Sequence, residues 1–153
     1  MAILRTRCPG NRNNARIARY LEESMLIDSN LIIYATQAQH QALRSWLVAH
    51  ASHYSAITRL ETLGYPNLQE AEQQAIMTIL DQLELLMIGS VTMELAIALR
   101  RQRKMTLGDA LIAATCLEHQ LPLASANEKD FTWINGLIIH NPLRQEAHGK
   151  QNG

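Results

Sequence analysis

The chain has 153 residues, of which 47% are apolar and 18% charged, and its formal net charge is zero. This length and composition predict one globular domain with its own core. They exclude a disordered chain, a collagen-like repeat and a strongly basic protein that coats nucleic acid. Action on nucleic acid through a local site remains open.

The first 24 residues differ in charge from the rest. They carry five arginines and two glutamates, whereas the remainder carries nine basic and twelve acidic residues. We expect residues 1–24 to be a basic N-terminal extension, flexible or helical, residues 25–143 to form the domain, and residues 144–153 to be a polar tail. A start at Met25 and a mitochondrial transit peptide are alternatives for the extension.

Helical periodicity alternates with short apolar runs along the domain. In chain order, we expect strands at 25–28, 53–57, 86–88, 121–125 and 137–140, and helices at 31–35, 40–50, 58–65, 68–86, 92–104 and 106–119. Ser29 and Asn30 would cap the first helix. Met77, Met87 and Met93 would fill the core. This order predicts an α/β fold, a three-layer α/β/α domain with a mainly parallel central sheet.

Cysteine usage and hydropathy indicate the compartment. Cys8 and Cys116 form no CxxC or zinc-type spacing. The longest apolar stretch, 83–99, is interrupted by two glutamates, so no membrane span is expected. The N-terminus lacks the apolar run of a secretory signal. We expect a cytoplasmic protein.

Two carboxylates stand out early in the chain. Asp28 directly follows an apolar run, and a carboxylate at the end of a buried strand lies where α/β sheets bind ligands. Glu61 shares a helical stripe with Ile57, Leu60 and Gly64, so it would point toward the apolar side. The alternatives are that Asp28 only caps the next helix and that Glu61 pairs with Arg59 or lies on the surface.

Two further carboxylates occur late in the chain. Asp109 opens a helix that is apolar nearly all round and therefore central, and Gly108 removes a side chain beside it. The spacing from Thr106 to Asp109 also fits a variant capping box. Asp130 shares a loop with Ser125 and Asn127, which would otherwise be an ordinary polar loop.

Four carboxylates in one cleft repel one another, and a hard divalent cation removes that repulsion. Mg²⁺ or Mn²⁺ prefers carboxylate and water oxygens, and one or two such ions activate water and offset charge on a phosphate. If Asp28, Glu61, Asp109 and Asp130 converge, the implied reaction is hydrolysis of a phosphodiester bond. Spacing in the sequence does not establish that convergence.

Four segments resemble the PIN-domain family, especially VapC-type toxin ribonucleases of toxin–antitoxin pairs. They lie within about 25–142 and occur in the family's order: Ile-Asp-Ser-Asn at 27–30, Ser-Ala-Ile-Thr-Arg-Leu-Glu at 55–61, Leu-Gly-Asp-Ala-Leu-Ile-Ala-Ala at 107–114, and Ser-Ala-Asn-Glu-Lys-Asp-Phe at 125–131. The segment before Met25 departs from the pattern, since these toxins normally begin at the first strand.

The resemblance implies an endoribonuclease dependent on Mg²⁺ or Mn²⁺, with an RNA substrate, a cognate antitoxin and a homodimer. Asp28, Glu61 and Asp109 match the family's acidic metal ligands, and Asp130 matches a fourth acid of less constant role. Ser29 matches a small hydroxyl residue, and Ser125 stands where many members have threonine. Cleavage would leave a 5′-phosphate and a 3′-hydroxyl.

Other features leave alternatives open. Arg100, Arg101, Arg103 and Lys104 either hold an RNA backbone or form a solvated helix end. A metal-free ribonuclease could use two of the six histidines, but no pair has informative spacing. The alternatives to a toxin are a PIN nuclease for RNA processing or DNA outside a toxin pair, and a catalytically inactive module whose acidic cleft binds a basic peptide.

Overall fold

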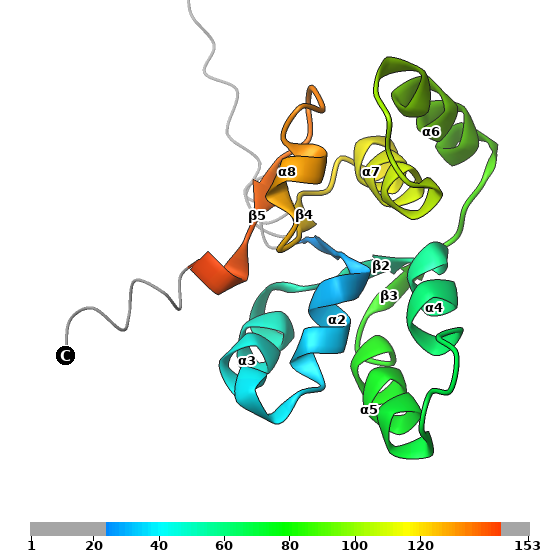
Figure 1. Cartoon of the computed structure of the whole chain (residues 1–153). Helices are drawn as coiled ribbons and strands as arrows, with labels where there is room; N and C mark the ends of the chain where they lie inside the picture. Colours follow the sequence, from blue (N-terminus) through cyan, green and yellow to red (C-terminus); the bar gives the residue numbers. More distant parts are fainter. Residues whose placement is uncertain (1–23, 145–153) are drawn as a thin grey trace, which may run out of the picture.

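The structure is a computed structural model that describes residues 24–144, and Figure 1 shows the whole chain. The predicted basic extension, apart from Ser24, and the predicted polar tail, apart from Arg144, lie outside the described residues. Within the part of the chain that is described, no helix has the length and apolar character needed to cross a bilayer.

A five-stranded sheet with the order β3-β2-β1-β4-β5 runs through the domain, and every pairing in it is parallel. The first strand of the chain therefore lies at the centre. The chain runs outward from β1 through β2 to β3, then passes to the other side of β1 and continues through β4 to β5. This arrangement confirms the predicted α/β fold with a parallel sheet. The strands are β1 Leu26–Ile27, β2 His53–Ser55, β3 Glu84–Leu86, β4 Leu123–Ala124 and β5 Ile139–His140.

Helices cover both faces of the sheet, as Figure 1 shows. Helices α2, α3 and α5 pack on one face, α6 and α7 on the other, and α4 contacts both α2 and α7. The helices are α2 Ser29–Ala35, the 3₁₀ helix η1 Ala38–His40, α3 Gln41–His50, α4 Ala56–Leu63, α5 Glu70–Leu80, α6 Ser90–Gln102, α7 Leu107–His119 and α8 Glu128–Phe131.

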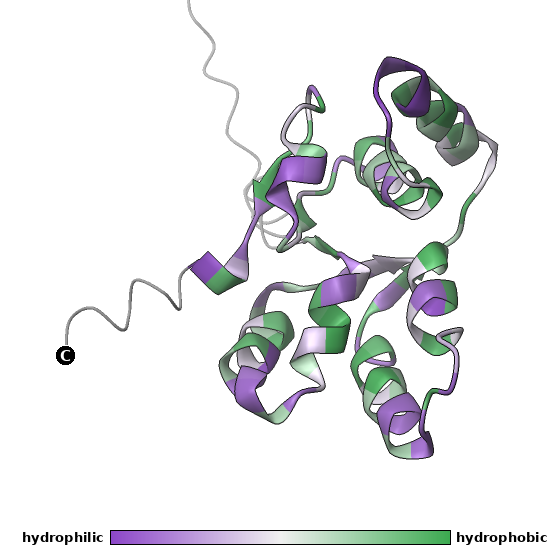
Figure 2. Cartoon of the chain, in the orientation of Figure 1, coloured by the Kyte–Doolittle hydropathy of each residue, from purple (hydrophilic) through white to green (hydrophobic). Residues whose placement is uncertain are grey.

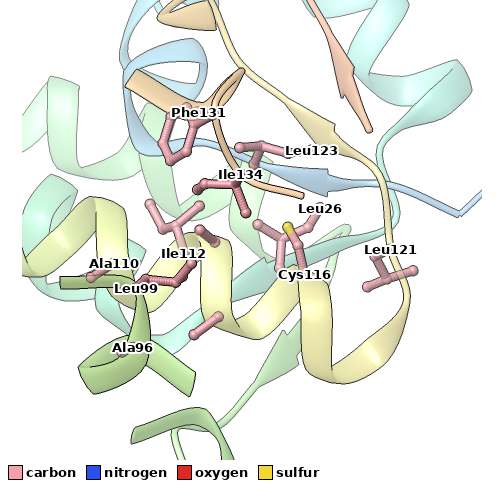
Figure 3. Close-up of a cluster of buried hydrophobic side chains, with 12 residues drawn as sticks. Leu26, Ala96, Leu99, Ala110, Ile112, Cys116, Leu121, Leu123, Phe131 and Ile134 are labelled. Atoms are coloured by element: carbon pink, nitrogen blue, oxygen red, sulfur yellow. The ribbon is translucent and has the colours of Figure 1, made fainter. Parts of the chain in front are cut away.

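The central strands supply both halves of the core. Successive strand residues point to opposite faces, so Leu26 and Leu123 join the cluster under α7, whereas Ile27 and Ala124 join the cluster under α2. All four are fully buried. Figure 3 shows the α7 side of the core, in which Phe131 anchors α8 beside the end of β4.

Three sequence expectations need correction. The helix predicted over 68–86 ends at Leu80, and Glu84–Leu86 forms β3 at the sheet edge in place of the strand expected at 86–88. The loop predicted around Asp130 contains the short helix α8. The core role predicted for Met87 and Met93 is wrong, because they are 69% and 47% exposed.

Candidate acidic site at the carboxyl edge of the sheet

Asp28 follows β1 and is 4% exposed. Its Oδ1 accepts a hydrogen bond of 2.8 Å from the backbone N–H of Ser29, which makes it the N-cap of α2 in place of Ser29 or Asn30. Its Oδ2 accepts a hydrogen bond of 2.7 Å from the hydroxyl of Ser125, directly after β4. The two interpretations of Asp28, a helix cap and a carboxylate at a strand end, therefore both hold.

Glu61 reaches across from α4 to two other helices. Its Oε1 accepts a hydrogen bond of 3.1 Å from the hydroxyl of Ser29 at the start of α2. Its Oε2 lies beside α7, since a Cβ placed on Gly108 would be 2.9 Å from that oxygen. The expected apolar stripe is wrong: Thr58 and Thr62 form the buried face of α4, and Leu60 is 69% exposed.

Asp109 lies in the first turn of α7. The hydroxyl of Thr106 accepts a hydrogen bond of 3.1 Å from the backbone N–H of Asp109, so the predicted cap is made by the threonine side chain. Gly108 leaves room for the carboxylate of Glu61 at the start of the same helix. The carboxylates of Glu61 and Asp109 therefore belong to one neighbourhood.

Burial and mutual repulsion act on these three carboxylates. Burial raises the pKa of Asp28 to about 6, the Ser125 hydrogen bond opposes that rise, and the charges of Asp109 and Glu61 add to it. Burial and the charge of Asp109 raise the pKa of Glu61. Burial and the charge of Asp130 raise the pKa of Asp109. The structure therefore brings Asp28, Glu61 and Asp109 together, although they are far apart in the sequence.

Asp130 and Asn127 lie on the outer side of this cluster. Asp130 is in α8, its side chain is exposed, and its charge acts on Asp109. Asn127 takes part through its backbone, whose N–H donates a hydrogen bond of 3.0 Å to the hydroxyl of Ser125. Ser125 thus links the loop before α8 to Asp28.

The donor set suits a hard cation. It consists of carboxylate and hydroxyl oxygens, and the raised pKa values show that added positive charge would be favourable there. Among residues 24–144, no three His, Cys, Asp or Glu side chains already stand as ligands around one point. The residues fit a divalent ion by their chemistry, and binding would require their side chains to draw closer.

The predicted cationic segment separates into two parts. Arg100, Arg103 and Lys104 line a pocket that also includes Asp109 and Asp130. Arg101 lies with Arg100 along an apolar groove between α6 and α7. Figure 2 shows how hydrophilic the chain is at the end of α6.

Two residues of the same pocket, Lys129 and Trp133, are absent from the sequence-based site. Lys129 precedes Asp130 in a stretch interpreted as a polar loop, and Trp133 follows it by three residues. The sequence carries no signal for either residue, because helix α8, which sets Trp133 beside Asp130, is too short to show a helical period.

The fold and the site together define a parallel α/β domain with carboxylates gathered at the carboxyl edge of its sheet. The sequence profile of the PIN domain matches residues 25–136. This chain belongs to the PIN-domain family. No curated protein sequence matches it.

Solved structures with the same fold include toxin–antitoxin complexes. A toxin–antitoxin complex from Klebsiella pneumoniae is 30% identical, with 77% of this chain and 97% of that chain covered and a TM-score of 0.60. VapBC2 from Rickettsia felis, bound to a promoter DNA fragment, is 20% identical, with 77% of this chain and 98% of that chain covered and a TM-score of 0.65. FitAcB from Neisseria gonorrhoeae is 22% identical, with 78% of this chain and 98% of that chain covered and a TM-score of 0.63.

Proposed function

We propose that this protein is a divalent-metal-dependent endoribonuclease that hydrolyses RNA phosphodiester bonds, and the toxin of a type II toxin–antitoxin system. The observation that carries the proposal is the convergence of Asp28, Glu61 and Asp109 from β1, α4 and α7 at one edge of the sheet. Membership of the PIN-domain family and the likeness to toxin–antitoxin complexes support it.

In this proposal, Asp28, Glu61 and Asp109 hold Mg²⁺ or Mn²⁺, and Asp130 assists from the outer side. Such an ion, when bound, lowers the pKa of water and offsets charge on the phosphate. Ser125 orients Asp28, and Ser29 orients Glu61, through hydrogen bonds of 2.7 and 3.1 Å. The hydrolysis would place the phosphate on the 5′ end and the hydroxyl on the 3′ end.

The proposed partners are a cognate antitoxin and a second copy of the chain. The structural neighbours from Klebsiella pneumoniae and Rickettsia felis are toxin–antitoxin assemblies. Exposed apolar side chains on α6 and α7, among them Val91, Met93, Ile97 and Leu107, support a protein-binding surface for the homodimer. The cytoplasmic location stays a prediction from the sequence.

Asp28→Asn and Asp109→Asn test the proposal, with Asp81→Asn as the matched control. Asp81 is exposed at the C-terminal end of α5, outside the acidic cluster. In Mn²⁺, the first two variants should lose RNA cleavage by at least about two orders of magnitude, whereas the control should cleave like the parent protein. Circular dichroism and melting curves should show that all three fold.

Metal binding gives a second readout that needs no substrate. Millimolar Mn²⁺ should raise the melting temperature of the parent protein and of Asp81→Asn, because an ion that binds only the folded state stabilises it. The rise should shrink in Asp28→Asn and Asp109→Asn. Undiminished cleavage in both cluster variants contradicts the proposed mechanism, and the absence of cleavage and of any metal effect favours the inactive binding module.

The toxin assignment is tested separately from the nuclease assignment. A small reading frame beside the gene, co-expressed with this chain, should give a complex that no longer cleaves RNA. Cleavage of RNA without such a neighbour favours RNA processing outside a toxin pair, and preferential cleavage of DNA contradicts the substrate.

A further inference from the structure

A pocket of about 510 Å³ opens between the end of α6, the start of α7, and α8 with the residues that follow it. Its lining includes Arg100, Arg103, Lys104, Asp109, Lys129 and Trp133. Asp109 belongs both to this pocket and to the acidic cluster. A molecule in the pocket therefore lies directly beside the proposed cleavage site.

The indole of Trp133 is held in a fixed orientation in this pocket. Its Nε1 donates a hydrogen bond of 2.9 Å to the backbone carbonyl of Asp130. The side chain is half-buried and packs against the core cluster on the α7 side of the sheet. Because the ring nitrogen already has an acceptor, a ligand meets the ring through its face and not through its polar edge.

A guanidinium already occupies a position over that ring. Cζ of Arg103 lies 5.7 Å from the centroid of the Trp133 ring, within the range of a cation–π contact. Arg103 is exposed and follows the last residue of α6. A planar group that stacks on the indole would be contacted on its other face by the arginine, since guanidinium groups stack on bases as they do on indoles.

The remaining charges of the pocket suit phosphate. Arg100, Lys104 and Lys129 add three cations from two separate segments, against the two carboxylates of Asp109 and Asp130. Nε of Arg100 donates a hydrogen bond of 3.2 Å to the carbonyl of Met105, which ties the turn after α6 to the helix. Cations contact the phosphate backbone without reading sequence, and aromatic faces stack on unpaired bases of any kind.

We propose that this pocket binds the unpaired nucleotide next to the bond that is cut, with its base stacked on Trp133 beneath Arg103 and its phosphate held by the surrounding cations. The inference rests on the proposed nuclease function and specifies its substrate as single-stranded RNA. A base that is paired in a duplex keeps its faces stacked on its neighbours and does not reach the indole.

Binding measured in EDTA separates this inference from catalysis. The probe is a labelled twelve-nucleotide RNA of mixed A and C, which does not pair with itself, compared with its duplex and with an abasic strand of the same length. Trp133→Ala should weaken single-strand binding by about 5- to 150-fold, the loss expected for one base–aromatic stack. Trp133→Phe should retain most of the binding, and the abasic strand should bind parent and variants alike.

Trp46 provides the matched control, because the chain has only two tryptophans and Trp46 lies on α3 against His50. In Trp46→Phe, single-stranded RNA should quench the fluorescence of the remaining Trp133. In Trp133→Phe, the same RNA should leave the fluorescence of Trp46 unchanged. These measurements do not require Trp133→Ala to fold.

Equal binding of single strand and duplex, with no effect of Trp133→Ala and no quenching, would overturn the inference and leave a phosphate-binding surface only. If the parent protein cleaves RNA and Trp133→Ala leaves KM unchanged, the inference fails and the proposed function stands. If the single strand binds and quenches but Asp28→Asn cleaves like the parent protein, the proposed mechanism fails and the stacking pocket stands.

Discussion

Ser125 donates a hydrogen bond of 2.7 Å to Asp28, although 97 positions separate the two residues in the sequence. The bond joins the ends of β1 and β4, which pair in parallel at the centre of the sheet. Ser125 is completely buried, so its hydroxyl has no access to bulk water. The buried carboxylate of Asp28 is therefore held by a residue directly after the adjacent strand.

Ser125→Ala should remove this support. Loss of the Ser125 hydrogen bond should raise the pKa of Asp28 further, because the bond favours the charged carboxylate. At pH 8 we expect a loss of about 1.5–3 kcal/mol in the free energy of unfolding, as for a hydrogen bond to a charged group. Urea titrations of the two proteins measure it. Ser125→Thr keeps the hydroxyl and should lose less, and equal losses in both variants would count against the assigned bond.

Asp28 should also make the metal-free protein more stable in mild acid. The pKa of Asp28 is 3.8 for an ordinary solvated carboxyl, as in the unfolded chain, and about 6 in the folded protein. The folded protein therefore binds the proton more tightly. The free energy of unfolding should therefore fall as the pH rises between these values. The loss contributed by Asp28 is about 3 kcal/mol at most by pH 7.5, at about 1.4 kcal/mol per pKa unit.

Asp28→Asn tests this pH dependence, since asparagine has nearly the same shape and does not titrate. Relative to the parent protein, the variant should gain stability at pH 7.5 and not at pH 4. Denaturation curves at both pH values in EDTA give the comparison. A parallel pH dependence in the two proteins would assign the effect to other groups.

Gly108→Ala should impair the acidic site without destabilising the fold. The new methyl group would lie 2.9 Å from Oε2 of Glu61, and the carboxylate has to move away from α7. Alanine is favoured over glycine inside a helix by about 0.5–1 kcal/mol, so the melting temperature should hold or rise. The Mn²⁺-induced rise in melting temperature and the RNA cleavage should both fall.

Gly89→Ala is the control for Gly108→Ala. Gly89 caps α6, and a Cβ there meets nothing within 4 Å. The control should keep the metal response of the parent protein. A normal metal response in Gly108→Ala as well would show that the position of Glu61 is unimportant for the ion.

Phe131→Ala should displace Asp130 by loosening α8. Phe131 is fully buried and is the last residue of this four-residue helix. We expect a loss of about 3–5 kcal/mol in the free energy of unfolding, as for other buried phenylalanines. Thr132→Ala, on the exposed residue that follows, should lose less than about 0.5 kcal/mol in the same urea titration. Similar losses would mean that Phe131 does not anchor the helix.

Ile97→Glu should weaken self-association if α6 and α7 meet a second copy. Ile97 is 40% exposed in an apolar groove between these helices. Sedimentation velocity should show a dimer for the parent protein and a monomer for the variant. Ile138→Glu, which alters an exposed apolar residue elsewhere, should remain dimeric. A monomeric parent protein would contradict the predicted homodimer.

The sequence was sufficient to predict the layered α/β fold, because the connections from β1 to β4 carry helical periodicity and each buried strand a short apolar run. It failed at the boundary between α5 and β3. There apolar residues recur past Leu80, at Leu83, Leu85 and Leu86, and Glu84 and Leu85 are exposed at the sheet edge, so neither the helical nor the strand period ends clearly. Helix α8 is too short to show a period at all.

Part of the acidic site could also be predicted from the sequence. A carboxylate directly after an apolar strand, as Asp28 is, is rare enough to attract notice, and the order of the motifs suggested its companions. The hydrogen bonds of Ser29 and Ser125 follow from distances that spacing does not encode. Trp133 was missed because the short helix that sets it beside Asp130 leaves no period in the sequence.

The placement of β1 at the centre of the sheet also governs when the site comes into existence. Its neighbour β4 begins at Leu123, so an unfinished chain that stops earlier leaves one side of β1 unpaired and Asp28 without Ser125. The acidic cluster therefore assembles only after most of the polypeptide has been synthesised. Fragments of this protein that end before Ser125 would therefore lack the hydrogen bond that holds Asp28.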